Sequence, residues 1–402
     1  MSSPAVKARR AKSSGSIVRR TTAAGQVRYE ARVSMPTEDG RPRRQYGKTF
    51  TTKADAQRWL NVELASVANG TASEDTKLTV GAWLDRWLVA HDVRETTRRG
   101  YVDLMRQHVV PRIGTTRLVD LRPGHLTAMY LAIGEDSRKP VPEGERKRRP
   151  VGPATVAKVH AVLRSALSDA HKDGYVPRNV ATLARVPKVP HREQQTWTPE
   201  QIRTFTTATS EDRLSALWLL LFRTGLRRGE ALGLRWEDVE LDAGGGFGQA
   251  TITQQVTVVG NRIVRGEPKT QAGRRTIALD PVVVAALRAW RKRQAADQLA
   301  AGPVWVGDPE IFTREDGRVL HPIDNVSRRF QRLAKDVGLP VIRLHDTRHS
   351  YGSNARAAGL DPKLLSTLLG HTDVRFTMNT YSQVQADEKV IAAALLAARL
   401  DG

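Results

Sequence analysis

Residues 224–236, TGLRRGEALGLRW, place an arginine where it could hold a phosphate group. Gly225 predicts the end of one helix, and Arg227 stands at the start of the next. Near a helix N-terminus, a guanidinium adds its fork of donors to free backbone N–H groups, a combination suited to phosphate oxygens. Glu230 lies three residues further on and could fix the rotamer of Arg227. Taken alone, the pattern fits a solvated or ion-paired arginine at least as well.

A lysine in the same half of the chain could donate a proton. Lys269 belongs to Pro268-Lys269-Thr270, in the connection that leads to a predicted strand at 274–279. From such a position an ammonium group can reach a leaving oxygen and protonate it. An ordinary exposed lysine explains the same residues, so this signal is weak without others.

The segment LHDTRHS, residues 344–350, combines a titratable group with a permanent cation. His345 and Arg348 are three residues apart, so a helix would place them on one face. A second interpretation is a metal site, because His345 and His349 are four apart and Asp346 stands where zinc hydrolases with H-E-x-x-H carry glutamate. Aspartate is one methylene shorter than that base, and Arg348 would bring positive charge near the metal. The metal interpretation is therefore the weaker one.

A tyrosine near the C-terminus is a candidate nucleophile. In residues 368–383, LLGHTDVRFTMNTYSQ, His371 follows a glycine that predicts a helix end, and Tyr381 comes ten residues later. A tyrosine in such a place is usually a buried core residue whose hydroxyl finds a partner. A phenol has a pKa of about 10 and needs cationic or basic surroundings to react. The arginines, the lysine and the histidines named above could supply them.

The first seventy residues predict a small basic module. Alternating residues predict strands at 16–20, 27–34 and 43–50, followed by a helix at 52–69. Residues 1–58 hold fourteen Lys and Arg against four Asp and Glu. We expect one domain at 1–70, consisting of a basic tail, three strands and a helix.

Two further segments follow. Helical periodicity predicts an all-helical domain at 77–184, with one of its helices ending at Pro111. Prolines mark 185–196 as a linker. The last segment, 197–402, predicts a mixed domain with capped helices after Thr198 and Asp361, an apolar helix at 214–223, strands at 250–259 and 275–279, and helices beginning near 281, 323 and 345. The fold class is therefore multidomain, mainly α with small β elements.

Composition narrows the function. The 402 residues carry a formal charge of +22, which favours a polyanionic partner, either nucleic acid or an anionic membrane surface. The sequence contains no cysteine, which excludes disulfides, cysteine zinc fingers, iron–sulfur clusters and thiol nucleophiles. No apolar run approaches the ~20 residues of a membrane span, and the N-terminus lacks the apolar part of a secretory signal. We expect a cytoplasmic protein.

The order Arg, Lys, His-x-x-Arg, His, Tyr resembles that of the tyrosine recombinases, the phage-type integrases. The resemblance extends over 197–402 through TGLRRGEALGLRW, KTQAGRRT, LHDTRHS and LLGHT, with the spacing to the tyrosine. It implies a mixed α+β tyrosine-recombinase catalytic domain. It also implies that 1–70 is an arm-type DNA-binding domain and that 77–184 is the helical core-binding domain. The site residues it implies are two phosphate clamps, Arg227 and Arg348; a general acid, Lys269; a general base or proton shuttle, His345; a phosphate hydrogen-bond donor, His371; a nucleophile, Tyr381; and two supporting residues, Glu230 and His349.

The activity implied is site-specific DNA recombination through a 3′-phosphotyrosyl intermediate, without ATP, metal or cofactor. The resemblance further implies a homotetramer on double-stranded DNA with core-type and arm-type sites, in a bacterial cytoplasm, serving to integrate and excise a phage or mobile element. An accessory DNA-bending protein or excision factor is a further expected partner. Two alternatives stay open: a DNA-binding regulator that has lost catalysis, and a zinc hydrolase built on His345 and His349. Basic residues expected to contact DNA in the first domain are Arg28, Arg32, Arg43 and Arg44.

Overall fold

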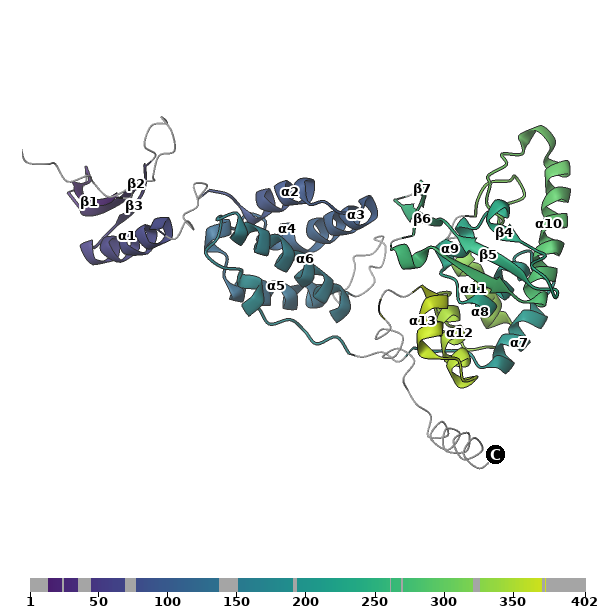
Figure 1. The fold of residues 1–402 in the computed structure, drawn as a ribbon. Helices are drawn as coiled ribbons and strands as arrows, with labels where there is room; N and C mark the ends of the chain where they lie inside the picture. The colour runs from purple at the N-terminus through teal and green to yellow at the C-terminus, as the bar shows by residue number, and fades with distance from the viewer. Residues whose placement is uncertain are drawn as a thin grey trace, which may run out of the picture. The chain divides into compact units, whose positions relative to one another are not determined.

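The computed structural model describes residues 14–23, 25–34, 45–68, 77–136, 151–190, 194–260, 262–268, 270–320 and 326–370, together with Asp373. The chain divides into two compact units, Met1–His191 and Arg192–Gly402. Within the described residues, the buried apolar side chains form three separate cores, two in the first unit and one in the second. Figure 1 labels most of the helices and strands around them.

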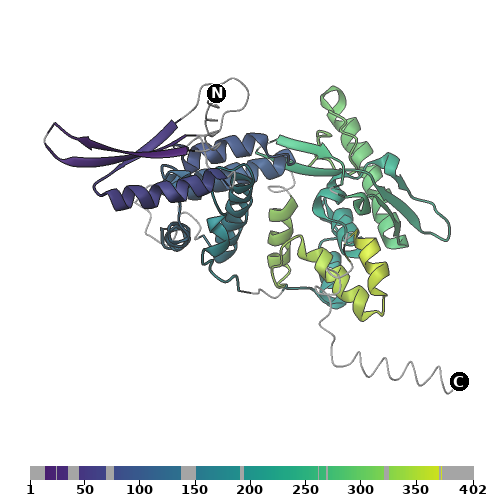
Figure 2. The ribbon, with the colours of Figure 1, turned by 60° about the vertical axis from the view of Figure 1, so that its left-hand side comes forward.

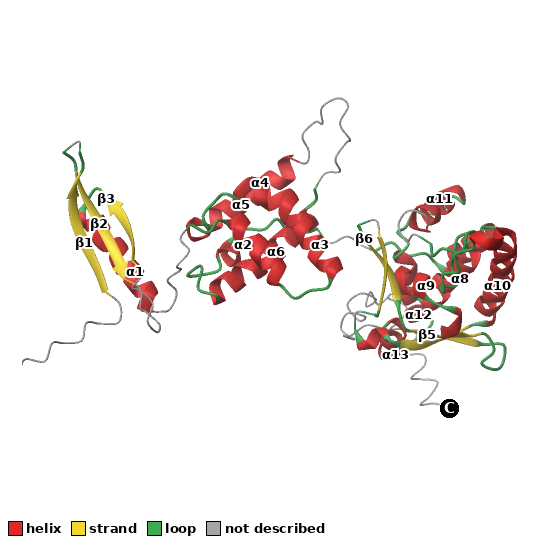
Figure 3. Ribbon diagram, turned by 90° about the horizontal axis from the view of Figure 1, so that it is seen from above, coloured by secondary structure: helices red, strands yellow, loops and turns green. Residues whose placement is uncertain are grey.

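The first core lies between a three-stranded antiparallel sheet and one helix. The strands pair in the order β1-β2-β3, and the elements are β1 (Ser14–Thr21), β2 (Val27–Ser34), β3 (Gln45–Phe50) and α1 (Lys53–Ala68). Ala31 and Val33 of β2 are fully buried against Ala56 and Leu60 of α1. Figure 3 shows the helix behind the yellow strands. The predicted strands and helix are confirmed, although Arg43 and Arg44 lie outside the described residues.

Because side chains alternate across a strand, burial of Ala31 and Val33 directs their neighbours to the other face of the sheet. Arg28, Glu30 and Arg32 occupy those positions and are partly exposed. The sheet therefore has one apolar face covered by α1 and one charged face that α1 does not cover.

The second core is helical. Its elements are α2 (Val80–Ala90), α3 (Glu95–Leu104), a π-helical turn (Met105–Val109), α4 (Val110–Ile113), a 3₁₀ turn (Leu118–Asp120), α5 (Pro123–Asp136), α6 (Pro153–Lys172) and a second 3₁₀ turn (Val180–Leu183). Two tryptophans of α2 bind α6: Trp83 donates to the carbonyl of Ala166 at 3.0 Å, and Trp87 donates to Asp169 at 2.9 Å. These bonds fix two helices that are about eighty residues apart in the sequence.

The predicted helix end at Pro111 is wrong. Val110 donates its N–H to the carbonyl of Met105, five residues back, so a π turn carries the helix on. Pro111 then stands in the first turn of α4, where a missing N–H costs little. Helix α5, which begins at Pro123, was not predicted.

The third core belongs to the second unit. Its helices are α7 (Pro199–Ala208), α8 (Ser215–Thr224), α9 (Arg228–Gly233), α10 (Pro281–Ala301), α11 (Arg328–Asp336), α12 (Asp346–Ala357) and α13 (Pro362–Leu369). The predicted capping box of α7 is confirmed, with Thr198 accepting from the N–H of Gln201. So are the limits of α13, where Asp361 caps the start and Gly370, at φ +65°, ends the helix. The helix expected near 323 is α11, five residues later.

Small strands complete this unit. One antiparallel sheet has the order β4-β5-β8, and a separate hairpin pairs β6 with β7; the strands are β4 (Val239–Glu240), β5 (Gly248–Ile252), β6 (Gln255–Val259), β7 (Arg262–Gly266) and β8 (Arg275–Leu279). The expected single strand at 250–259 is therefore wrong, because the chain leaves one sheet after Ile252 and enters the hairpin at Gln255. Strand β7 was not predicted, whereas β8 was.

Helix α8 lies within the third core, and its C-terminal end leads into the segment that contains Arg227. Its apolar residues, among them Leu217, Trp218 and Leu221, are almost wholly buried. Helices α12 and α13, yellow in Figure 2, lie side by side and contact each other, and α12 also contacts α8. In the described part of the chain, none of the helices is long and apolar enough to cross a membrane.

Candidate active site

Arg227 stands in the short connection between α8 and α9. Helix α8 ends at Gly225, whose φ of +64° allows a tight turn. A Cβ at this position would lie 2.5 Å from the Tyr351 ring of α12 and 2.8 Å from Leu369 of α13. Only glycine lets the three helices approach this closely. Arg227 follows two residues later as the residue before α9, as the sequence predicted.

Glu230 holds Arg227 from the first turn of α9. The Nη1 of Arg227 donates to Oε1 of Glu230 at 2.7 Å, and its backbone N–H donates to Oε2 at 2.9 Å. The carboxylate side chain is 2% exposed, whereas the Arg227 side chain is 37% exposed. The guanidinium is thus fixed at its inner side and open at its outer side, as a clamp for an external anion requires.

Arg275 of β8 is a residue of this network that the sequence analysis missed. Its Nη2 donates to Oε2 of Glu230 at 2.9 Å and its Nε donates to the carbonyl of Leu368 at 2.7 Å. Burial alone would raise the pKa of Glu230, but the hydrogen bond and charge of Arg275 and the charge of Arg227 outweigh it and lower that pKa. The only signal was the arginine pair in KTQAGRRT, to which no role was given.

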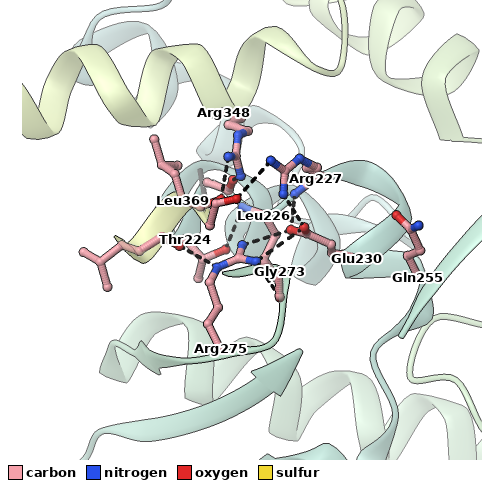
Figure 4. Close-up of polar contacts among 12 residues, drawn as sticks. Thr224, Leu226, Arg227, Glu230, Gln255, Gly273, Arg275, Arg348 and Leu369 are labelled. Atoms are coloured by element: carbon pink, nitrogen blue, oxygen red, sulfur yellow. Dashed lines mark hydrogen bonds and ion pairs between the residues drawn. The ribbon is translucent and has the colours of Figure 1, made fainter. Parts of the chain in front are cut away.

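Arg348 reaches the same place from α12. It is 2% exposed. Its Nη1 donates to the carbonyl of Gly225 at 2.9 Å and its Nη2 to the carbonyl of Leu369 at 2.5 Å. Arg227 donates to the next carbonyl, that of Gly370, at 3.4 Å. Figure 4 shows the guanidinium groups of Arg227 and Arg348 close together beside Leu369. The structure therefore brings together two arginines that are 121 positions apart in the printed sequence.

His345 precedes α12 and lies next to His349, with ring centroids 5.1 Å apart in an edge-to-face arrangement. Burial, followed by the charges of His349 and Arg348, lowers the pKa of His345 to about 4. Part of the residue is nevertheless exposed to solvent, which weakens this effect of burial. Burial also lowers the pKa of His349. Both imidazoles are therefore neutral near pH 7, and the exposed one can accept a proton.

The alternative metal site finds no support in the geometry. Both carboxylate oxygens of Asp346 accept hydrogen bonds from Arg343, between 2.9 and 3.1 Å. Among the residues that the structure describes, no group of three or more His, Cys, Asp or Glu side chains could hold a metal ion. The zinc interpretation needs a third ligand that these residues do not supply.

Three predicted site residues, Lys269, His371 and Tyr381, lie outside the described residues. The chain on either side of Lys269 is described: Pro268 is buried, and the carbonyl of Thr270 accepts from the N–H of Gly273 at 2.9 Å. Gly370, whose carbonyl contacts Arg227, immediately precedes His371. The described part of the site thus consists of Arg227, Glu230, Arg275, His345, Arg348 and His349.

A second candidate site is the charged face of the N-terminal sheet. Glu30 lies between two arginines there, at 2.7 Å from Arg20 and 3.0 Å from Arg32. The hydrogen bond from Arg32, partly offset by desolvation and reinforced by the charge of Arg20, lowers the pKa of Glu30. Arg28 is directly opposite Arg20 in the strand register. Arg20 was not predicted as a site residue, although it lies on the same face as the predicted Arg28 and Arg32.

Comparison with known families identifies two regions of the chain. Residues 195–388 match the phage integrase family, and residues 79–131 match the N-terminal SAM-like domain of phage integrases. Together the two matches cover more than half of the sequence. The first match includes the described site residues of the second unit, from Arg227 to His349, and it also spans Lys269, His371 and Tyr381.

Related proteins match along most of their length. A tyrosine recombinase XerC-like protein of Caldanaerobacter subterraneus subsp. tengcongensis is 28% identical over 87% of this chain and 90% of its own. The integrase of Mycobacterium phage L5 is 25% identical over 87% and 89%, respectively.

Solved structures share the fold. The Tn1549 transposon integrase in complex with a circular intermediate DNA has a TM-score of 0.66 at 22% identity, over 79% of this chain and 99% of that one. A lambda integrase tetramer bound to a Holliday junction has a TM-score of 0.53 at 17% identity, over 88% and 95%. These likenesses concern the fold. With the family matches and the clustered arginines, they lead to one conclusion: the chain is a tyrosine recombinase of the phage integrase family.

Proposed function

We propose that this protein is a site-specific DNA recombinase, an integrase, which cleaves and rejoins DNA through a 3′-phosphotyrosyl intermediate. The observation that carries the proposal is the convergence of Arg227 and Arg348 at the end of α13, directly before His371. Two fixed guanidinium groups, one of them partly exposed, can bind the non-bridging oxygens of a single phosphate.

In the proposed reaction the hydroxyl of Tyr381 attacks a scissile phosphate. A bond forms between the tyrosine oxygen and phosphorus, and the bond from phosphorus to the 5′-oxygen breaks. His345, neutral at pH 7, takes the phenolic proton, and Lys269 gives a proton to the departing 5′-oxygen. A 5′-hydroxyl from a partner duplex then attacks the phosphotyrosine and reverses these steps. The ester bond conserves the energy of the phosphodiester, so the proposed reaction needs no ATP.

The arginines stabilise the charge that develops on the phosphate oxygens. Donors that are already in place before the reaction contribute about 3–4 kcal/mol each to the transition state. Arg348 is placed by carbonyls of Gly225 and Leu369, and Arg227 by Glu230, so neither has to be reoriented when DNA binds. His371 is proposed as a further donor to the phosphate, and His349 supports the ring of His345.

We also propose the division of labour along the chain. Residues 1–70 would bind arm-type DNA sites, 77–184 core-type sites, 185–196 would link, and 197–402 would catalyse. The sheet face with Arg20, Arg28 and Arg32 supports a DNA-binding role for the first domain, and Arg43 and Arg44 are proposed to add to it. The same proposal includes a homotetramer that acts on two duplexes in a bacterial cytoplasm. It also includes an accessory DNA-bending protein or excision factor, and the integration and excision of a phage or mobile element.

The test is covalent trapping. Nicked suicide duplexes made from the DNA that flanks the gene in its host are incubated with the protein and analysed on denaturing gels. The wild type should form a covalent protein–DNA adduct. Tyr381→Phe should form none while still binding DNA.

Tyr351→Phe is the matched control, because Tyr351 packs on Gly225 and lies within reach of the charges of Arg275 and Arg348. Burial raises the pKa of Tyr351, which makes it a poor nucleophile, so its variant should keep the adduct. An adduct from Tyr381→Phe would refute the assignment of the nucleophile. DNA binding without any adduct from the wild type would favour a regulator that has lost catalysis.

A further inference from the structure

We infer that Arg275 is a positioning residue for recombination, which sets Arg227 and the end of α13 in the geometry that cleavage requires. The inference rests on the proposed function, because it concerns the placement of the proposed phosphate clamp. Arg275 itself would not contact DNA.

Three consecutive carbonyls at the end of α13 accept hydrogen bonds from three different arginines. The carbonyl of Leu368 accepts from Arg275 at 2.7 Å, that of Leu369 from Arg348 at 2.5 Å, and that of Gly370 from Arg227 at 3.4 Å. The last carbonyls of a helix lack partners within the helix and carry partial negative charge, so cations bind there favourably. The end of α13 is thus held by three arginines, up to the residue that precedes His371 in the sequence.

Arg275 also joins this helix end to Glu230. One guanidinium spans both contacts: Nε binds the carbonyl of Leu368, and Nη2 binds Oε2 of Glu230 at 2.9 Å, with Nη1 at 3.4 Å from Oε1. Oε1 of Glu230 in turn binds the side chain of Arg227 at 2.7 Å, and Oε2 binds its backbone N–H at 2.9 Å. A displacement of Arg275 would therefore move Glu230, Arg227 and the residue before His371 together.

The partners of Arg275 argue against a direct role in binding phosphate. Its Nε, Nη1 and Nη2 all donate to protein acceptors, including the carbonyl of Gly273 at 3.1 Å, and its charge is paired with the buried carboxylate of Glu230. Gly370 closes over it: a Cβ there would lie 2.9 Å from Nη1 of Arg275 and 2.8 Å from the carbonyl of Ala272. Arg227, by contrast, is 37% exposed. Arg275 can act on the phosphate only through the arginine that it helps to hold.

The position of Arg275 in the chain lets it contact several segments of the proposed site. Arg275 begins β8, six residues after Lys269, and it contacts the segments that carry Arg227 and precede His371. A single buried side chain therefore ties together three segments that supply proposed catalytic groups. A rigid fork is required, because lysine has one nitrogen and cannot span the same acceptors.

The experiment measures single-turnover cleavage of the suicide duplex in two forms, one with the normal scissile phosphate and one with an uncharged methylphosphonate there. The transition state at a neutral linkage carries less negative charge, so its stabilisation depends less on positive side chains. We expect Arg275→Met to slow cleavage of the normal duplex by about 100-fold, the range for loss of a positioned donor. We expect a slowing of no more than about tenfold on the methylphosphonate duplex, with DNA affinity within about threefold of wild type.

The adjacent Arg274 offers a matched control, because it is exposed and directly precedes β8. Arg274→Met should cleave within about twofold of the wild-type rate on both duplexes. If Arg275→Met unfolds, Arg275→Lys replaces it; this variant keeps the charge but loses the fork, and should show about tenfold slowing on the normal duplex and less on the other.

The outcomes separate this inference from the proposed function. Wild-type protein that forms no adduct overturns the proposed function. Wild-type cleavage combined with an unimpaired Arg275 variant overturns only the positioning role. Equal slowing on both duplexes also overturns it, because a purely structural defect does not depend on the charge of the scissile linkage.

Discussion

Glu230 accepts hydrogen bonds from Arg227 at two points, the side-chain Nη1 at 2.7 Å and the backbone N–H at 2.9 Å. The acid is buried and the guanidinium is partly exposed. A short ion pair on one helical turn therefore sets the direction in which the proposed phosphate clamp points.

Glu230→Gln should destabilise the catalytic unit and impair cleavage. The change keeps the shape of the side chain but leaves buried Arg275 without its counter-charge, a loss of about 3–5 kcal/mol for a broken buried pair. The pKa of Glu230 is lower in the folded state than in the unfolded state. The stability advantage of the wild type should therefore be complete at pH values above the unfolded-state pKa and disappear as the pH falls through the folded-state pKa. Chemical denaturation between pH 3 and pH 7 measures the loss of stability and its pH dependence, and adduct formation measures cleavage. Glu237→Gln, at an exposed glutamate paired with Arg235, should change little, and equal losses in the two variants would contradict this account.

His345 should be neutral throughout the physiological range. Its pKa in the folded protein is lowered to about 4, chiefly by burial. The contribution of this group to stability is then complete above the unfolded value of about 6.5 and is lost as the pH falls toward the folded value. Imidazole NMR signals, assigned with His345→Gln, should titrate well below pH 6.5, and the melting temperature of the wild type relative to that variant should fall between pH 6.5 and pH 4. A signal of His345 that titrates above pH 6.5 would contradict the prediction.

Gly370→Ala should slow cleavage more than its effect on stability explains. The residue has φ +65°, and an added Cβ would meet Arg275 and the carbonyl of Ala272 below 3.0 Å. Backbone strain of this kind costs about 1–2 kcal/mol, and displacement of Arg275 adds a defect in the site. Gly359→Ala has the same kind of strain, at φ +85°, but open space around the new Cβ. Melting curves and adduct formation should therefore separate the two variants, with cleavage retained only by Gly359→Ala; loss of cleavage in both would point to strain alone.

The charged face of the N-terminal sheet should account for part of the salt dependence of DNA binding. If Arg28 and Arg32 contact phosphates, replacing either with alanine should reduce the slope of log K against log salt by about 1. Arg58 of α1, whose side chain is 79% exposed, is the control and should leave the slope unchanged. Fluorescence anisotropy with a duplex of arbitrary sequence, titrated at several salt concentrations, measures the slopes. Unchanged slopes for Arg28→Ala and Arg32→Ala would show that this face does not neutralise phosphates.

Local signals in the sequence predicted local structure well. The capping box at Thr198, the cap at Asp361 with its stop at Gly370, and the alternation of β2 all depend on residues within a few positions of one another. The pair Arg227 and Glu230 belongs to this class, since one helical turn brings them together. Errors arose where a local rule had two outcomes: Pro111 stands in the first turn of α4, directly after a π turn, instead of ending a helix.

The amino-acid order was enough to name the family and its candidate residues, because residue types and their spacing are properties of the chain itself. It could not reveal that Arg275 binds Glu230 and Leu368, which are 45 and 93 positions away. Nor could it place Arg348 on the carbonyl of Gly225, 123 positions earlier. Contacts over such distances are set by how α8, α9, α12, α13 and β8 pack, and packing depends on the shape of the whole core, which no short spacing encodes.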